Sequence, residues 1–377
     1  MTGERIVILG GYGNTGRAVA RLLLEHSTAD LVLAGRDPAK ANHAAEELNR
    51  AFGTARVRGA EADASRSESL RPVLDGASIV VAASSTSAHV AVVGRAVLDA
   101  GADYMDPQYS TRKLDVLRGL EASIEAAGRC FVTDAGFHPG LPAALVRYAA
   151  GRLPSIRRAQ VASVIQINWK ELEFSPATLE EMVGEFADYQ SLHYRDGRWR
   201  SMGWLESFVP IWVQFGRGFG RRYTMPMFLE EMRPLPSMFP SLKETGFFVG
   251  GFNPVVDFVL MPVGMGLMKV APKRGAALFG RLLEWGLREF TRPPYGTLLQ
   301  LEAEGEQDGR PAALTIEVAH SDGYLLTAAP MVACLLQMLD GSARKPGLHL
   351  QALLVEPARF LDDLKMMGVE VLVRDGR

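Results

Sequence analysis

The sequence is poor in the features that mark several classes of protein. It has only two cysteines, Cys130 and Cys334, both in apolar runs; we expect buried thiols in a reducing compartment rather than a disulfide framework. Basic and acidic residues number 41 and 43, for a formal net charge of −2, which gives no electrostatic case for nucleic acid as a partner. The seven histidines show no H-x-x-x-H spacing and C-x-x-C is missing, so no metal site is expected.

The chain also lacks the long apolar core of a signal peptide near its N-terminus, where Glu4 and Arg5 precede a short apolar run. We therefore expect a cytoplasmic protein. One nearly apolar stretch, residues 246–268, has about the length of a membrane span. It contains Asp257, two prolines and five glycines, and a charge at bilayer depth is costly. A buried helix or a subunit interface is favoured, with membrane association as the alternative.

The most informative stretch is residues 5–16, RIVILGGYGNTG. Its apolar run, residues 6–9, is typical of a strand buried on both faces of a parallel sheet. Gly11, Gly13 and Gly16 follow in the G-x-G-x-x-G spacing. In that motif the first glycine permits a tight turn, the second lets backbone approach a pyrophosphate, and the third lets the next helix pack closely. The helix N-terminus adds free N–H groups. The stretch predicts a dinucleotide site.

The end of the second expected strand, residues 30–34, indicates which dinucleotide binds. An acidic residue at this point contacts the ribose hydroxyls of NAD, whereas an arginine accommodates the 2′-phosphate of NADP. Here the strand is followed by Gly35 and Arg36, so we predict NADP. Asp37 comes next, but because it precedes Pro38 it is better explained as the N-cap of the following helix.

Two later strand ends add candidate cofactor contacts. Asp63 follows the third expected strand, residues 55–60; its carboxylate can reach an adenine amino group or can belong to a solvated loop. The fourth expected strand, residues 78–83, leads into Ser84 and Ser85. Small side chains there let a cofactor lie across the crevice at the carboxyl ends of the strands.

The length of 377 residues exceeds the usual size of a single core and predicts more than one domain. Residues 1–150 alternate six expected strands with helices, which is the doubly wound α/β pattern of a Rossmann domain with a parallel sheet. Residues 323–377 contain two expected helices and a final strand. We expect this last segment to return and pack on the Rossmann domain.

Residues 151–322 show a different pattern. Residues 156–169 are a long strand candidate, and Asp196-Gly197 is a hairpin signal. Residues 297–306 and 312–320 are expected to form a second hairpin. Strands joined by hairpins, with helices between them, predict an α+β domain built on a mostly antiparallel sheet.

Four motifs together resemble the saccharopine dehydrogenase-like oxidoreductases: GGYGNTG, LAGR, the serine loop, and GFHPGLP at residues 136–142. The likeness is good over residues 1–152 and looser in SDGYLLTAAPM, residues 321–331. It implies an N-terminal NADP-binding Rossmann domain and an inserted α+β domain. It also implies hydride transfer between NAD(P)H and a carbon–nitrogen or, in some branches, a carbon–carbon double bond. The implied cofactor contacts are Gly11, Gly13, Asn14, Thr15, Gly16 and Arg36.

One departure from the family pattern bears on the substrate. Many members place a Gly-Glu pair shortly after the fifth strand, whereas this chain has the sequence DPQY at residues 106–109. A contact at the reactive site is therefore not carried over, and neither is saccharopine as substrate. The sequence predicts an NADPH-dependent reductase that acts on the imine of a small amino-acid-like or amine substrate. Reduction of an activated C=C bond and a non-catalytic or membrane-associated cofactor-binding protein are the alternatives.

Hydride transfer of this kind needs a proton donor near the acceptor. His138 follows the sixth expected strand, at the edge where a nicotinamide would lie, and histidine titrates in the useful range. His138 is the first candidate, although it can instead shape the turn into the next helix. Tyr109 is the second candidate, and Tyr104 is an alternative that more often only packs.

A substrate carboxylate would need arginines, which bind carboxylates in a bidentate manner. Two sets are available in the second domain, with solvated surface arginines as the alternative for each. They are Arg221 and Arg222, and Arg195, Arg198 and Arg200.

The apolar residues of 247–261 raise the question of assembly. Ten of them crowd this short segment, and a helix that is apolar all round must be buried on most sides. A domain of this size lacks the core to bury such a helix. We therefore expect a homodimer formed through the second domain.

Arg36 leads to a prediction about cofactor choice. NADPH should bind better than NADH, and Arg36→Ala should remove most of that preference, because a 2′-phosphate would lose a charge-assisted contact of about 1.5–3 kcal/mol. Dissociation constants for both cofactors, measured on the unaltered protein and the variant, test this. Equal affinities in the unaltered protein contradict the prediction.

Overall fold

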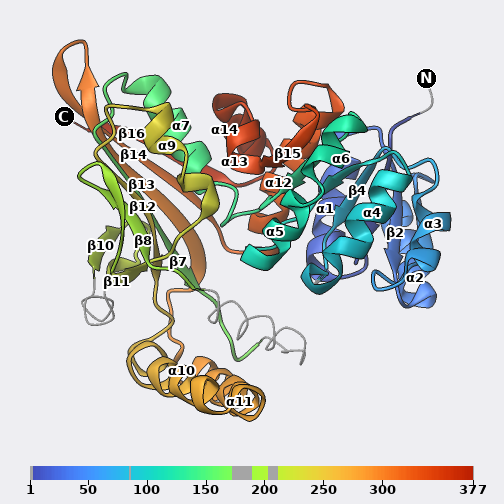
Figure 1. Ribbon diagram of the computed structural model, residues 1–377, viewed down its shortest axis with the longest axis horizontal. Coiled ribbons are helices and arrows are strands. Elements are labelled where there is room, and N and C mark those ends of the chain that lie inside the picture. Colours follow the sequence, from blue (N-terminus) through green and yellow to red (C-terminus); the bar gives the residue numbers. More distant parts are fainter. Residues whose placement is uncertain (1–2, 85, 172–188, 203–210, 377) are drawn as a thin grey trace. The chain divides into compact units, whose positions relative to one another are not determined.

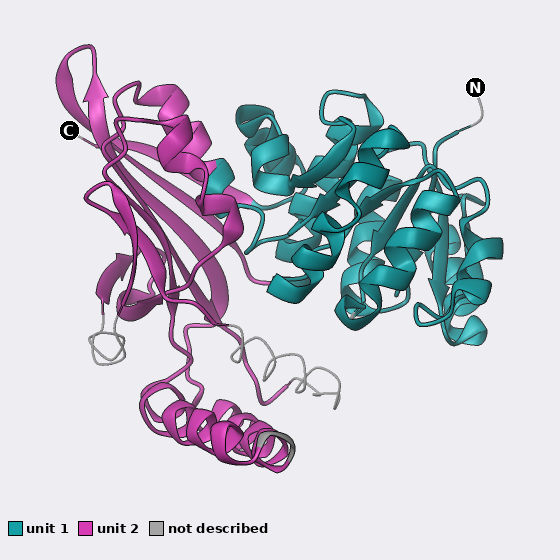
Figure 2. Cartoon of the chain, in the orientation of Figure 1, with its two compact units in different colours: residues 1–144, 324–369 teal, residues 145–323, 370–377 magenta. Residues whose placement is uncertain are grey.

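The computed structural model describes residues 3–84, 86–171, 189–202 and 211–376. The chain forms two compact units (Figure 2). The first contains residues 1–144 and 324–369, and the second contains residues 145–323 and 370–377. The chain thus passes into the second unit within helix α7 (Pro142–Arg152), returns to the first, and ends in the second.

The described residues of the first unit contain a seven-stranded sheet in the order β15-β6-β5-β4-β1-β2-β3. Every pairing in it is parallel, which confirms the doubly wound fold expected from the sequence. The strand order reverses between β1 and β4, and ligands of open parallel sheets bind outside the carboxyl ends at such a point. The strands are β1 (Arg5–Leu9), β2 (Asp30–Gly35), β3 (Val57–Glu61), β4 (Ile79–Ala82), β5 (Asp103–Met105), β6 (Cys130–Thr133) and β15 (Gly347–Leu350).

Helices alternate with these strands along the chain. Helix α2 begins after Asp37, whose Oδ1 accepts a hydrogen bond from Lys40 N at 3.0 Å; the N-cap predicted at Asp37 is confirmed. Cys130 and Cys334 are free and buried, also as expected. The helices of this unit are α1 (Asn14–His26), α2 (Pro38–Phe52), α3 (Ser67–Leu74), η1 (Ser87–His89), α4 (Val90–Asp99), α5 (Thr111–Arg118), α6 (Glu121–Ala126), α12 (Gly323–Leu339), α13 (Gln351–Leu354) and α14 (Pro357–Met366).

The second unit is built on a mixed and mostly antiparallel sheet, in the order β10-β11-β12-β7-β13-β14-β16 with β8 and β9 attached to β12. Only the pairing of β12 with β7 is parallel among the described strands. The predicted α+β architecture and both predicted hairpins are confirmed. The strands are β7 (Arg158–Gln166), β8 (Leu192–Arg195), β9 (Arg198–Ser201), β10 (Ile211–Phe215), β11 (Gly220–Pro226), β12 (Glu244–Gly250), β13 (Gly296–Gln307), β14 (Arg310–His320) and β16 (Glu370–Gly376).

The prediction of one buried helix over residues 246–268 is wrong for its first part. Residues 246–250 belong to β12, a central strand in which Phe247 and Phe248 are buried. A short apolar run fits a buried strand as well as a helix, so the sequence pattern could not separate the two. The helices of this region lie on either side of β12 in the sequence. Before it come η3 (Glu230–Met232) and α9 (Leu235–Met238), and after it come η4 (Val256–Leu260), α10 (Met261–Val270) and α11 (Pro272–Phe290).

Helices α10 and α11 lie side by side (Figure 1). Val256 and Leu260 of η4 pack with Phe279, Leu283 and Leu287 of α11 in one hydrophobic cluster. The other side of α10 is exposed. Across the described residues, no helix is long and apolar enough to cross a membrane.

The expectation that residues 323–377 return as a whole to the first domain is wrong for the final strand. Residues 324–369 belong to the first unit, whereas β16 pairs with β14 in the sheet of the second, with Ile316 opposite Val373. The free edge of β14 offers a ladder of backbone donors and acceptors that an apolar strand can satisfy. Strand β15, which adds to β6 in the first sheet, was not predicted because it has only four residues and contains a histidine.

Candidate functional site at the carboxyl edge of the first sheet

The glycine turn after β1 is held by close contacts with its neighbours. Gly10, which precedes the three motif glycines, has φ +78°, a conformation that favours glycine. A Cβ on Gly11 would lie 2.9 Å from the Leu33 side chain of β2. A Cβ on Gly16 would lie 2.3 Å from the carbonyl oxygen of Gly10. The turn therefore packs too closely for side chains at these positions.

The N-terminus of α1 follows this turn and presents open backbone donors. Gly13 is the N-cap residue, makes no side-chain capping bond, and is followed by no acidic residue in the first turn. Gly13 and Asn14 are exposed, and Thr15 is half-buried. Free N–H groups and the positive end of a helix dipole suit a phosphate. The arrangement fits the pyrophosphate of a dinucleotide.

The ends of β2 and β3 bring Arg36 and Asp63 together. Arg36 is exposed directly after β2, and its charge contributes to lowering the pKa of the Asp63 carboxyl, after the hydrogen bonds that Ser65 donates. Tyr12 of the glycine turn covers the same place: its hydroxyl accepts from the backbone N–H of Asp37 at 3.3 Å, and a Cβ on Gly35 would lie 2.4 Å from its ring. Arg36, Asp63 and Tyr12 therefore lie at one place, at the carboxyl ends of β2 and β3.

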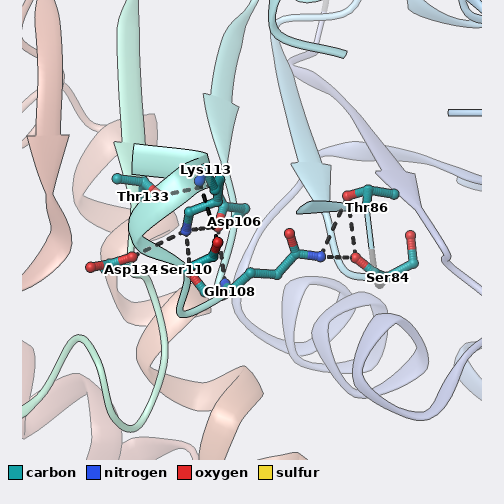
Figure 3. Close-up of polar contacts among 8 residues, drawn as sticks. All are labelled: Ser84, Thr86, Asp106, Gln108, Ser110, Lys113, Thr133 and Asp134. Carbon is teal, nitrogen blue, oxygen red and sulfur yellow. Dashed lines mark hydrogen bonds and ion pairs between the residues drawn. The ribbon is translucent and has the colours of Figure 1, made fainter. Parts of the chain in front are cut away.

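The loop after β4 approaches the glycine turn from the other side. A Cβ on Gly10 would lie 2.4 Å from the Cβ of Ser84, so Ser84 belongs to the same edge. Ser85 lies outside the described residues. Gln108, which follows β5, donates from Nε2 to the Ser84 carbonyl oxygen and lies 3.5 Å from Thr86 Oγ1 (Figure 3). The Gln108 side chain therefore links the loop after β5 to the loop after β4 by a hydrogen bond.

A buried cluster of charges follows β5 and β6. Lys113 Nζ donates to Asp106 Oδ1 at 2.6 Å and to Asp134 Oδ1 at 3.1 Å, and also to the Gln108 carbonyl oxygen (Figure 3). Thr133 Oγ1 donates to Asp106 Oδ2 at 3.0 Å. The Lys113 and Asp106 side chains are fully buried. Burial by itself lowers the pKa of Lys113, but Asp106 and Asp134 outweigh it and raise the pKa above its ordinary value, so the lysine is charged.

The sequence analysis missed Lys113. A lysine inside a helix is normally solvated, but α5 starts after the Ser110 cap, whose Oγ accepts from the Lys113 backbone N–H at 3.3 Å. Because the helix begins at this point, the Lys113 side chain reaches Asp106 and Asp134 at the ends of β5 and β6. The available signal was the pair of carboxylates, Asp106 and Asp134, directly after adjacent strands, because two buried carboxylates require a cation.

His138 and Tyr109, the two predicted proton donors, both follow strands of this edge. Tyr109 is half-buried in the segment between β5 and α5, and His138 lies between β6 and α7 with its Nε2 buried. Burial lowers the pKa of His138 to about 4, so the imidazole is neutral at neutral pH. Tyr104 packs in β5 against Phe131, with ring centroids 5.3 Å apart.

The two arginine sets of the second unit have different surroundings. Arg195 pairs with Glu244 at 3.4 Å and Arg200 with Asp196 at 3.3 Å, so these two are held in surface ion pairs. Arg221 and Arg222 of β11 line a cavity of about 640 Å³.

Comparison with known families concerns the first unit. A family model described as the saccharopine dehydrogenase NADP binding domain matches residues 6–132. These residues form a saccharopine dehydrogenase-type NADP-binding domain. The chain thus carries the cofactor-binding domain of a family of NAD(P)-dependent oxidoreductases, and the resemblance seen in its glycine turn is confirmed. A search of curated proteins gives no match.

Solved structures share the architecture. An apo saccharopine dehydrogenase (L-Glu forming) from Saccharomyces cerevisiae has a TM-score of 0.70 at 14% identity, with 100% of each chain covered. At this identity the likeness shows the fold alone, with one unit built on a parallel sheet and one built on a mostly antiparallel sheet. More distant are a meso-DAPDH variant with DAP from Clostridium tetani E88 (TM-score 0.47, 11% identity, 94% and 95% covered) and the C. glutamicum DAP dehydrogenase in complex with DAP (0.48, 14%, 97% and 99%).

The pKa of His138 predicts a pH effect on the saccharopine dehydrogenase-type unit. Between about pH 6.5 and about pH 4 the unfolded chain binds a proton at this residue and the folded chain does not. Stability should therefore fall as the pH is lowered through this window, and His138→Gln should lose less than the unaltered protein. Denaturant unfolding at both ends of the window measures the difference. His43→Gln, an exposed histidine on α2, is the control, and equal losses for His138→Gln and the unaltered protein contradict the prediction.

Proposed function

We propose that the protein is an NADPH-dependent reductase that transfers a hydride to the C=N bond of an imine, formed from a small amino-acid-like or amine substrate. The observation that carries the proposal is the carboxyl edge of the first sheet, where a close-packed glycine turn and a helix N-terminus without a side-chain cap lie beside a buried lysine held by two carboxylates. The coenzyme supplies the hydride.

Each part of this edge has a role in binding the coenzyme. Gly11, Gly13 and Gly16, with Asn14 and Thr15, would hold the pyrophosphate. Arg36 would contact the 2′-phosphate, since it is exposed at the end of β2. Asp63 would lie at the adenine, and Ser84 would border the crevice toward the nicotinamide.

The second part of the proposal concerns protons. Lys113 is charged and joins Asp106, Asp134 and the Gln108 carbonyl, so it fixes the segment that carries Tyr109. We assign Lys113 the role of a positioning residue. Tyr109 and His138 are the candidate donors; at neutral pH the low pKa of His138 leaves only its neutral N–H as a donor, which favours Tyr109.

The reaction is tested by screening for NADPH oxidation. Pairs of a keto acid and an amine supply imines, and α,β-unsaturated carbonyl compounds supply activated C=C bonds, which are the alternative acceptor. Turnover with the first set and not the second supports imine reduction. Turnover with the second set alone favours the alternative.

The role of Lys113 gives a prediction for the active substrate. Lys113→Met should lower kcat by about 10²-fold or more with little change in the dissociation constant for NADPH, because the segment that carries Tyr109 loses its anchor, whereas the glycine turn keeps its own backbone hydrogen bonds from Gly10 and Gly11 to the Ala34 carbonyl oxygen. Removing one partner of a buried ion pair also costs about 3–5 kcal/mol of stability, so Asp134→Asn, which keeps the Lys113–Asp106 pair, serves as a milder second variant. Lys365→Met, at an exposed lysine of α14, is the control. Unchanged kcat in both buried variants contradicts the role.

Assembly through the second unit is the remaining proposal. Eight of the ten apolar residues that prompted it are buried or half-buried, but η4 and α10 keep an exposed apolar face, with Val259 at 54%, Val263 at 51% and Val270 at 86% exposure. The spacing of these valines places them on one side of a helix. A second copy would cover this face by a two-fold contact.

The proposed dimer has a direct test in light scattering. We expect a mass near twice 41.1 kDa without detergent, and dissociation in Val263→Glu, because a charge would be buried at the contact. Met366→Glu, at an exposed methionine of α14 in the first unit, should leave the mass unchanged. A monomeric mass for the unaltered protein, or a need for detergent, rules the dimer out.

A further inference from the structure

A cavity of about 640 Å³ lies in the second unit, where strands β7, β10, β11 and β12 meet the base of the α10–α11 pair. Its volume falls within the range of small-molecule sites. All of its lining residues belong to the second unit. A ligand bound there requires neither the coenzyme nor the proposed reduction.

Five aromatic side chains line this cavity. Trp212 of β10 stands opposite Tyr223 of β11 in the sheet register, with the rings edge-on at 6.1 Å. Tyr223 in turn contacts Phe258, with ring centroids 5.1 Å apart. Phe252 and Phe290 complete the aromatic lining. Such walls offer a hydrocarbon group a surface on which to exclude water.

Three arginines share the lining with these rings: Arg221, Arg222 and Arg292. The guanidinium of Arg221 lies over the Trp212 ring, 5.0 Å from its centroid, and the Nε of Arg222 donates to the Phe219 carbonyl oxygen at 3.0 Å. Within the part of the chain that the structure describes, none of the three forms an ion pair. Arg217, on the turn before β11, by contrast pairs with both Glu317 and Glu370.

The acidic residue nearest to this lining is already committed to the protein. Asp257 accepts hydrogen bonds from the backbone N–H groups of Phe252 at 3.2 Å and Asn253 at 2.9 Å, and from the Tyr223 hydroxyl. A Cβ on Gly251 would lie 2.3 Å from its Oδ2, so the turn closes tightly around this carboxyl group. Asp257 is buried and is not among the residues that line the cavity. The three arginines therefore line the cavity without an acidic residue among the described residues that share this lining.

We propose that this cavity binds an amphipathic carboxylate, in which an apolar chain ends in an acid group. The aromatic walls take the apolar part, and the arginines of β11 hold the carboxylate, for which the planar guanidinium is suited. A ligand without the apolar chain leaves the aromatic rings in contact with water. A ligand without the carboxylate leaves the arginines without a negatively charged partner. The site therefore selects for both parts together.

Titration calorimetry on the purified full chain tests this with three probes: octanoate, 1-octanol and acetate. Octanoate contains both parts, octanol lacks the charge and acetate lacks the chain. We expect octanoate, kept below its micellar concentration, to bind at least about tenfold more tightly than either of the others. No binding of octanoate, or equal affinity for octanol or acetate, overturns the proposal.

Variants of the lining residues test whether octanoate binds in this cavity. The double change Arg221→Gln with Arg222→Gln should weaken octanoate about tenfold or more, through loss of charge-assisted contacts, and Trp212→Ala should weaken it through loss of apolar contact. Arg221 and Trp212 are exposed and Arg222 is half-buried, and the thermal midpoint of each variant checks that it folds. Arg310→Gln, at an exposed strand arginine of the same unit, is the matched control. Unchanged affinity in both site variants overturns the assignment to this cavity, as does an equal loss in the control.

Discussion

The buried charge of Lys113 is the constraint on which the carboxyl edge of the first sheet depends. An ammonium group removed from water is tolerated only when anions and hydrogen-bond acceptors surround it. Asp106 and Asp134 supply the charge, and the Gln108 carbonyl supplies a further acceptor. Because the two carboxylates follow neighbouring strands, one lysine joins both strand ends and holds the segment between β5 and α5 in place.

The consequences of that anchor reach across the edge. Gln108, fixed at its carbonyl by Lys113, extends its amide to the loop after β4 and donates to the Ser84 carbonyl. Ser84 in turn touches Gly10 of the dinucleotide turn. A chain of short contacts therefore runs from the buried charge to the turn at which a pyrophosphate would bind. In the proposed reductase, Lys113 would act by holding these segments in place.

In the second unit a single tight turn has a comparable influence. Asp257 closes the link between β12 and η4 by accepting two backbone N–H groups and the Tyr223 hydroxyl. The turn places Phe258 where it both lines the cavity and is partly exposed. The burial that raises the pKa of Asp257 to about 6 reflects how closely the turn is packed. The cavity and the exposed face of α10 thus arise from one local structure.

Features that depend on neighbouring residues could be predicted from the sequence. They include the glycine turn, the Asp37 cap, the position of Arg36 after β2 and the Asp196-Gly197 hairpin, because a few adjacent residues set their backbone conformation. Three features could be seen only in the folded chain: residues 246–250 form a central strand, β16 joins the second sheet, and Lys113 is buried between two carboxylates. Each of these depends on a partner far along the chain: an apolar run suits strand or helix until its neighbours are known, and a lysine is solvated unless the fold brings anions to it.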